Sequence, residues 1–189
     1  MPVPGHAGVA FTIDDQAYIA NLISDLEDDR RDIFLQYDSS MNIWIELDDV
    51  PFIFPNSRNS AVSHNGNGYI LNVARSFRDG VLKDSTEVLR FDRNGNWQKL
   101  PSIDLIFNDA VSVVIDNSIY ITTGRELFGL VKYNLDDYSY IYTCIPDQIL
   151  RSEAVGYADE NDIIIVGGLE DNPSQDIFKS LNSVYRIRL

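Results

Sequence analysis

Hydrophobic and polar positions along this chain follow a phrase that returns four times. Its first half is an apolar run, a polar turn and a second apolar run. Its second half is a shorter apolar and aromatic run, a polar turn, and then Trp or Tyr in the first three repeats. The first half occupies residues 9–19, 61–71, 112–122 and 155–166, and the second half occupies 33–47, 87–101, 130–144 and 183–189. Self-similarity of this kind indicates a repeat architecture.

The spacing of the repeats is regular inside each half and variable between the halves. Tyr18, Tyr69, Tyr120 and Ile164 are separated by 51, 51 and 44 residues. In the second halves, Trp or Tyr follows the preceding aromatic anchor by seven, six and seven residues. We therefore expect four units that share a local geometry and differ in their connecting loops.

Each half of the phrase predicts a β-hairpin. The arms are rich in Val, Ile, Tyr and Phe, which suit a pleated, half-buried surface. The turns contain Asp, Asn and Gly, as in Asp14-Asp15 and Asn65-Gly66-Asn67, and these residues tolerate positive φ. No stretch of ten residues shows the period of an amphipathic helix. Two hairpins per repeat give four strands, which is the blade of a β-propeller.

The sequence therefore predicts an all-β fold, a β-propeller of four blades with four antiparallel strands in each. The last blade lacks its outer strand, because the chain stops after residue 189. The repeats span approximately residues 5–51, 57–105, 107–146 and 150–189, and we expect them to form one domain.

Several short phrases resemble those of a known family. Residues 60–70 (SAVSHNGNGYI) are similar to the first hairpin of a kelch blade, and residues 44–47 (WIEL) and 96–101 (NWQKLP) to its W-x-x-L fourth strand. Residues 163–168 (IIIVGG) and 182–186 (NSVYR) carry the diglycine and the third-strand phrase. The chain resembles kelch-repeat β-propellers over essentially its whole length, including galactose-oxidase-type and bacterial kelch-like propellers of the surface and periplasm. The resemblance implies kelch-like blades.

The chain departs from the kelch pattern in its details and in its number of repeats. Only the fourth unit keeps the diglycine, and Tyr140 stands where the third Trp would be. Kelch propellers usually have more than four blades. The chain is either a segment of a longer propeller, a four-bladed ring such as hemopexin-like domains form, or one of two copies that share edges. An open last blade would also permit self-association, because it exposes unpaired backbone groups.

Composition sets limits on the class of protein. A chain of 189 residues with 44% hydrophobic residues can bury about 70% of its unfolded surface in one domain. No run of 18 apolar residues is present, so we expect no membrane span. No signal peptide is visible. The compartment is therefore unknown: we expect it to be cytoplasmic as the chain stands, and periplasmic or extracellular if a signal lies upstream. The lone Cys144 excludes an intrachain disulfide and is expected to be a buried, inert thiol.

The net charge of −14 argues against nucleic acid as a partner, because phosphate contacts require cations. Few residues suggest catalysis or metal binding. Only His6 and His64 could serve a copper site or a Ser-His-Asp triad, and neither has a suitable context. The turn at residues 159–162 could hold a cation but has ordinary turn chemistry. We therefore expect no cofactor, no metal and no catalytic residue.

Candidate binding residues come from the loops that join the strands. We expect loops between second and third strands at residues 22–32, 72–86, 123–129 and 167–182, and between blades at residues 48–59, 101–109 and 146–153. Kelch propellers that bind acidic peptides or sugar acids place arginines around the mouth of the central channel, and a guanidinium suits a carboxylate ligand. The resemblance therefore gives four candidates, although each could instead balance a neighbouring acidic residue. They are Arg58, Arg75, Arg125 and Arg151. A second set of loop residues could form a recognition surface, but we expect it to be buried between blades: Phe52, Phe54, Phe77, Phe107, Phe128 and Phe178.

The function that we expect is noncovalent recognition, with a protein or peptide bound at the loop face around the channel. One alternative that the resemblance implies is a carbohydrate-active enzyme of the kelch sialate-mutarotase type, for which a sugar acid would be the ligand. Another is a structural segment of a larger bacterial surface or periplasmic protein. A fold by itself does not decide among these functions.

Overall fold

The computed structural model describes most of the chain. The described residues are 5–6, 8–24, 32–48, 50, 59–78, 81–107, 110–122, 129–145, 154–172, 177–180 and 183–189. They form strands and turns, and they include no helix long and apolar enough to cross a membrane.

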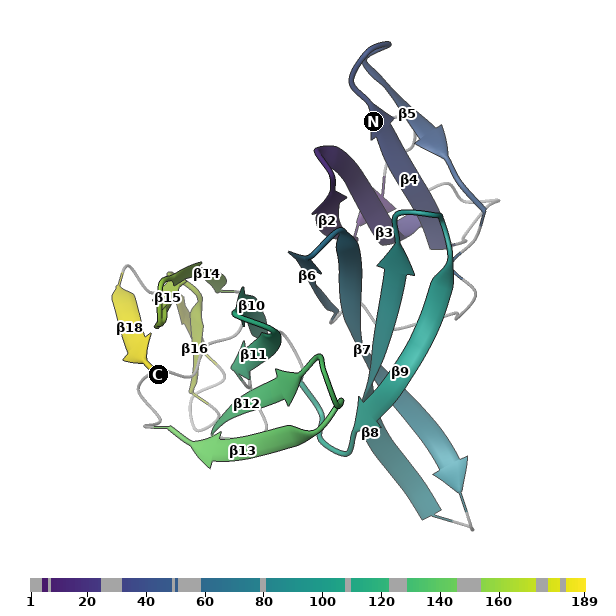
Figure 1. Ribbon diagram of the computed structural model, residues 1–189. Helices are drawn as coiled ribbons and strands as arrows, with labels where there is room; N and C mark the ends of the chain where they lie inside the picture. Colours follow the sequence, from purple (N-terminus) through teal and green to yellow (C-terminus); the bar gives the residue numbers. More distant parts are fainter. Residues whose placement is uncertain are drawn as a thin grey trace. The chain divides into compact units, whose positions relative to one another are not determined.

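The chain is an all-β protein with four successive antiparallel sheets, each of which can be followed in Figure 1. The sheets are the blades of a four-bladed β-propeller, as the repeats predicted. The first blade contains β1 (Gly5–His6), β2 (Val9–Ile13), β3 (Gln16–Ser24), β4 (Asp32–Asp38) and β5 (Ile43–Glu46). The second contains β6 (Ser60–His64), β7 (Asn67–Arg78), β8 (Val81–Asp92) and β9 (Trp97–Ile103). The third contains β10 (Val111–Ile115), β11 (Ser118–Thr122), β12 (Gly129–Asn134) and β13 (Tyr140–Cys144).

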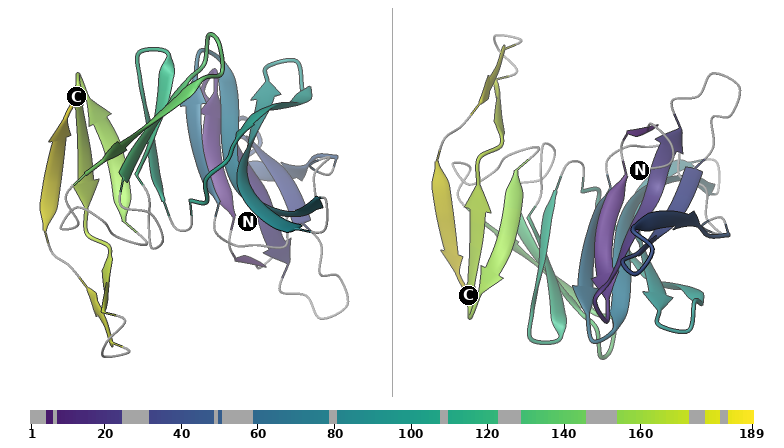
Figure 2. Two further views of the ribbon diagram at one scale, coloured as in Figure 1. Left: turned by 90° about the horizontal axis from the view of Figure 1, so that it is seen from below. Right: turned by 90° about the horizontal axis from the view of Figure 1, so that it is seen from above.

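The fourth blade has three strands, in the order β14 (Val155–Asp159), β15 (Asp162–Val166) and β18 (Val184–Arg188). Between β15 and β18 the chain makes a separate hairpin of β16 (Leu169–Asn172) and β17 (Ile177–Ser180), which the further views of Figure 2 show extending from the blade. The absence of an outer strand from the last blade was predicted from the sequence.

The hairpin turns form where the sequence placed them. Asp14 and Asp15 have φ of 47° and 66°, and Asn65 and Gly66 have φ of 47° and 69°. Two successive residues with positive φ give the turn whose twist matches that of the flanking strands. The Asp, Asn and Gly residues at these positions therefore determine the register of two hairpins, β2–β3 in the first blade and β6–β7 in the second.

The structure corrects two loops that the sequence analysis placed between second and third strands. Residues 72–86 were expected to be a loop, but β7 continues to Arg78 and β8 begins at Val81. Residues 167–182 were also expected to be a loop, and they contain the hairpin of β16 and β17. In the first segment, Val73, Phe77 and Val81 favour the extension of β7 and β8 as strands.

The described contacts divide the chain into two compact units. One unit comprises Met1–Ala74 and Glu87–Ser102, and the other comprises Arg75–Thr86 and Ile103–Leu189. The expectation of a single domain stays a prediction.

The first unit has an aromatic core. Phe11 and Tyr18 stack with their ring centroids 5.3 Å apart, and Phe91 and Trp97 lie 4.8 Å apart. The backbone nitrogen of Thr12 in β2 donates a hydrogen bond to Ser63 Oγ in β6, at 2.8 Å. The innermost strands of the first two blades are therefore joined directly.

The second unit has an aliphatic core. Val111 and Val113 of β10 pack with Ile163 and Ile165 of β15. A Cβ atom at Gly156 of β14 would lie 2.0 Å from Val111 Cγ1, so only glycine permits this approach between the two blades. These contacts fix the third blade against the fourth.

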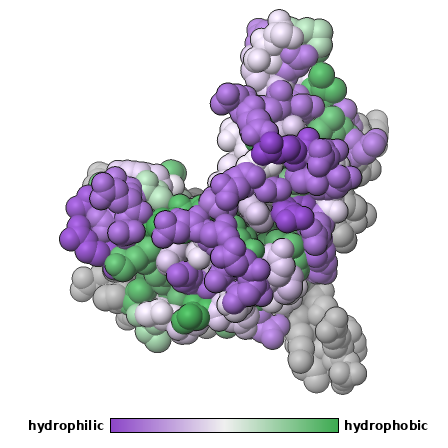
Figure 3. Space-filling model, viewed as in Figure 1, coloured by the Kyte–Doolittle hydropathy of each residue, from purple (hydrophilic) through white to green (hydrophobic). Residues whose placement is uncertain are grey.

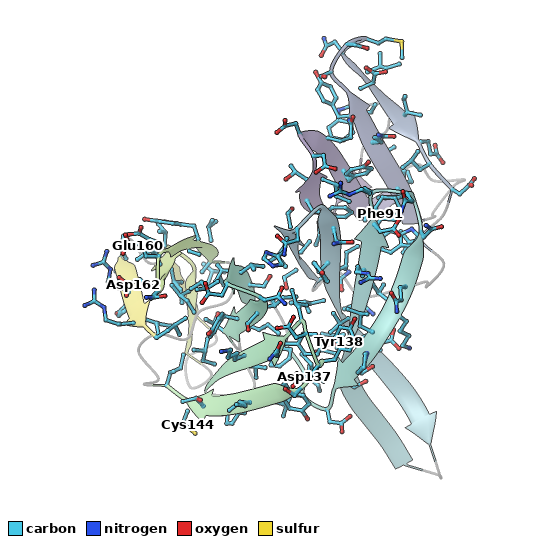
Figure 4. The ribbon with its side chains drawn as sticks, viewed as in Figure 1. Phe91, Asp137, Tyr138, Cys144, Glu160 and Asp162 are labelled. Atoms are coloured by element: carbon cyan, nitrogen blue, oxygen red, sulfur yellow. The ribbon has the colours of Figure 1, made fainter. Side chains whose placement is uncertain are left out.

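Cys144 is exposed, which corrects the expectation of a buried thiol. It ends β13, as Figure 4 shows, and all five residues of that strand are exposed. The prediction that Cys144 lies in a strand is confirmed. Strand β13 is the last strand of its sheet, so only β12 lies beside it there.

Candidate functional site: the pocket beside strand β18

Strand β18 is the last strand of the fourth blade and presents one edge that no described strand pairs with. On its inner side, Leu189 N donates to Asn161 O and Gly167 N donates to Ser183 O, both at 3.1 Å. Backbone groups in an antiparallel pair alternate in direction along each strand. The N–H and C=O groups of Val184, Arg186 and Arg188 are therefore directed away from β15, as they would be to receive a further strand.

The two faces of β18 differ in chemistry. Val184, Arg186 and Arg188 share one face, while Tyr185 and Ile187 share the other, because successive side chains in a strand alternate. Ile187 packs against the core that contains Ile163 and Ile165. The strand is therefore basic on one face and apolar on the face that is directed toward the third blade.

A pocket of about 330 Å³ opens on the apolar face of β18. It lies between the end of β18 and the outer strands of the third blade. Figure 3 shows hydrophobic surface on the side of this unit where β13 and β18 lie. This volume is at the lower end of the range of ligand pockets. Residues of both blades line it, among them Tyr120, Leu130, Lys132, Ile141, Ile187 and Leu189.

The two blades approach each other most closely at their inner strands, where Gly156 of β14 lies against Val111 of β10. The inner half of the gap is filled by Val111, Val113 and Ile163. In the outer half, Tyr120, Lys132 and Ile141 stand in one cross-strand row of β11, β12 and β13. No fourth strand of the last blade covers that row among the described residues. The missing strand thus explains both the open edge and the open pocket.

Asp162 holds the two arginines of the basic face in place. Its buried carboxylate accepts hydrogen bonds from Arg188 Nε at 3.0 Å and Nη2 at 3.3 Å, and Arg186 Nε lies 3.1 Å from Oδ2. The hydrogen bond from Arg188, with the charges of both arginines, lowers the pKa of Asp162. The side chains of Arg186 and Arg188 remain 55% and 74% exposed, so both guanidinium groups can still contact an acidic residue.

Lys132 is the other cation near the pocket. Its Nζ lies 5.7 Å from the centroid of the Tyr120 ring, which is within range of a cation–π interaction. With Arg188, it places positive charge at the edge of an apolar pocket in a chain whose net charge is −14. The site therefore favours a ligand that combines apolar and acidic groups.

The four arginines predicted from the kelch resemblance are not part of this pocket as described. Arg58, Arg125 and Arg151 lie outside the described residues, and Arg75 lies in β7 with its side chain outside them. Whether these four arginines converge stays a prediction. The sequence analysis did not select Arg186 and Arg188. Their signal was the alternation of Arg with Tyr and Ile in the strand at the open end of the last blade.

Two asparagines form an unusual buried pair near the predicted loop face of the second blade. Ser60 pairs with Leu71, so Asn59 and Asn72 stand opposite each other one residue further along. The side-chain amide atoms of both residues are buried and have no hydrogen-bond partner among the residues that the structure describes. Such groups are rare in folded proteins. The sequence analysis gave no reason to select either residue.

The remaining candidates are resolved only in part. Phe107 is buried, as expected, whereas Phe52, Phe54 and Phe128 lie outside the described residues. Phe77 and Phe178 lie in β7 and β17, with side chains outside them. Asp162, the last residue of the predicted turn at residues 159–162, is the first residue of β15 and binds two arginines; Figure 4 labels it beside Glu160. The described residues contain no group of three His, Cys, Asp or Glu that could hold a metal ion.

The blades and their repeated hairpins define a β-propeller. Among solved structures, the chain is similar to YjhT, a kelch-type propeller protein, with a TM-score of 0.71 and 14% sequence identity. The match covers 99% of this chain and 66% of the YjhT chain. No family model and no curated protein matches the sequence. The likeness to YjhT shows the fold, and the site must be interpreted from its own residues.

Proposed function

We propose that this chain is a kelch-like recognition module that binds an extended polypeptide segment along β18. The observation that carries the proposal is the open backbone edge of β18 beside the apolar pocket. In strand addition, main-chain hydrogen bonds supply affinity, and pockets for alternate side chains supply specificity. Both parts are present on the same strand.

The chemistry of the segment follows from the two faces of β18. A residue of the segment that lies opposite Arg186 should be acidic, because a guanidinium forms charge-assisted hydrogen bonds with a carboxylate, and a residue opposite Arg188 should be acidic or aromatic, because a guanidinium also binds the face of a ring. The alternate residues should be apolar, because they point toward Ile187 and the pocket. The preferred ligand is thus an extended segment in which apolar and acidic residues alternate.

Two synthetic peptides test this proposal, one alternating Ile and Glu and the other alternating Ile and Lys. Calorimetric titration of the full chain should show binding of the Ile–Glu peptide at least about tenfold tighter, because like charges opposite each other in a sheet are unfavourable. The variant Arg188→Glu should reduce or reverse the preference. Equal binding of both peptides, or binding of neither, would contradict the proposal.

Recognition at the loop face is the second part of the proposal, and it rests on the kelch resemblance. Arg58, Arg75, Arg125 and Arg151 would there bind carboxylate groups of the ligand. A binder of this kind should lose affinity, without unfolding, when Arg75 or Arg125 is changed to Ala. The sugar-mutarotase alternative has no specific observation in its favour among the described residues.

A further inference from the structure

Strand β5 is the last strand of the first blade and has the chemistry that β18 would recognise. Ile43 and Ile45 are 45% and 38% exposed, although both are large and apolar. They share one face of the strand, and Trp44 and Glu46 share the other. Strand β5 thus has an outer edge that no described strand pairs with, and it is apolar on one face and aromatic and acidic on the other.

We propose that the segment bound by β18 is β5 of a second copy of this chain, an inference that rests on the proposed function. In an antiparallel pair, Glu46 of one copy would lie opposite Arg186 of the other. That register also sets Trp44 opposite Arg188 and Ile45 opposite Ile187. The contact is head to tail, because it joins two different surfaces.

The hydrogen-bonding pattern of the two strands is compatible with this register. Leu47 N donates to Phe34 O at 2.8 Å, so the backbone of Leu47 is directed toward β4. By alternation, the backbone groups of Trp44 and Glu46 are directed away from β4. On β18 the outward groups belong to Val184, Arg186 and Arg188. The proposed register therefore places outward groups of one strand against outward groups of the other.

The side chains agree with the same register. Ile45 meets Ile187 on the pocket face, and Ile43 lies opposite Leu189, which lines the pocket. On the other face, the carboxylate of Glu46 meets the guanidinium of Arg186, and the Trp44 ring faces Arg188 in a cation–π arrangement. One alignment thus satisfies the backbone, the apolar face and the charged face together.

Charge also favours β5 over a second β18 as the added strand. Two β18 strands paired about Arg186 would set Arg186 against its own copy, and like charges directly opposite in a sheet are destabilising. Pairing of β18 with β5 replaces that repulsion with an Arg–Glu pair. A second copy supplies this strand at the concentration of the protein itself.

The test is the mass of the full chain in solution, measured by light scattering over a range of concentrations. The unchanged chain should associate as its concentration rises. Arg186→Glu alone and Glu46→Arg alone should each weaken association about tenfold, because each sets like charges opposite each other. An equimolar mixture of the two variants should associate again, since each copy then offers the charge that the other lacks. A variant that carries both Arg186→Glu and Glu46→Arg should also associate, because opposite charges again face each other across the contact.

Two variants control for net charge. Arg93→Glu changes an exposed residue in the turn between β8 and β9, and Asp104→Arg changes an exposed residue after β9. Arg93→Glu changes the net charge by as much as Arg186→Glu does, and Asp104→Arg by as much as Glu46→Arg does. Neither control residue belongs to the sheet that contains β5 or to the sheet that contains β18. Both should associate as the unchanged chain does. Circular dichroism melts verify that each variant is folded.

Each outcome bears on the proposal. Association that the single charge reversals weaken and the mixture restores supports it. A chain that stays monomeric at every concentration, or association that ignores the reversals, overturns it. If Arg186→Glu does not fold, Ile45→Asp in the first blade replaces it and should also block association. Binding of the Ile–Glu peptide by a monomeric chain would leave the proposed function standing while this inference fails.

Discussion

At the residue scale, the turns are held by carboxylates that accept several hydrogen bonds. Asp92 Oδ1 accepts from the backbone nitrogens of Asn94 and Asn96, each at 2.9 Å. The bond from Asn96 is the main reason that the pKa of Asp92 is lowered. The pKa of Asp38 is lowered in the same way, chiefly by the hydroxyl of Ser40. The repeated aspartates are therefore turn-forming groups that must be ionised to act.

These lowered pKa values predict acid sensitivity. A carboxyl whose pKa is lower in the folded state stabilises the fold fully above its unfolded pKa of about 3.9, and this contribution is lost as the pH falls through the folded pKa. The melting temperature should therefore fall as the pH is lowered below about 4. Asp162→Asn removes one such group and should weaken the dependence. A melting temperature that rises on acidification would contradict the assignment.

At the element scale, the strands follow from the sequence more closely than their ends do. Alternation and the Asp, Asn and Gly turns predicted the hairpins of all four blades. They did not predict the extension of β7 and β8, although Asp79-Gly80 between them is a strong hairpin dipeptide. It was missed because the strands were taken from the repeated phrases, the first of which ends at residue 71 and the second of which begins at residue 87. The open edge of β18 was predicted, but the pocket was not, because it depends on residues of two blades that are distant in sequence.

The buried asparagine pair of the second blade gives a prediction about stability. Asn72 is fully buried and its amide atoms find no partner in the described part of the chain, which is unfavourable by about 1–3 kcal/mol per group. Asn72→Leu should therefore leave the free energy of unfolding unchanged or raise it by about 1 kcal/mol. Denaturant titration at equilibrium measures this change.

Thr86→Val provides the matched control. Thr86 is also buried, but its Oγ1 donates to Leu105 O at 2.8 Å. Its replacement should lower the free energy of unfolding by about 1 kcal/mol. If Asn72→Leu is as destabilising as Thr86→Val, the asparagine amide has a partner and the interpretation of the pair is wrong.

At the scale of the whole molecule, the chain is a series of blades, and no strand of its described part pairs with the outer edge of β5 or of β18. Exposed edges usually carry charges that oppose association. Here the edges of β5 and β18 carry opposite charges. These charges oppose the pairing of two β18 strands, but they favour the pairing of β18 with β5. The net charge of −14 keeps copies apart in general, and the local pairing of Glu46 with Arg186 would give the contact its specificity.

The central claim is that β18 receives an added strand, and residue-resolved amide hydrogen exchange tests it most directly. In a dilute sample, the amides of Val184, Arg186 and Arg188 should exchange rapidly, while that of Ile187, directed toward β15, should be protected. At high concentration, or with the Ile–Glu peptide, the amides of Arg186 and Arg188 should become protected as well. If they are already protected in the dilute monomer, or gain no protection on addition of either partner, the edge of β18 is not the binding site.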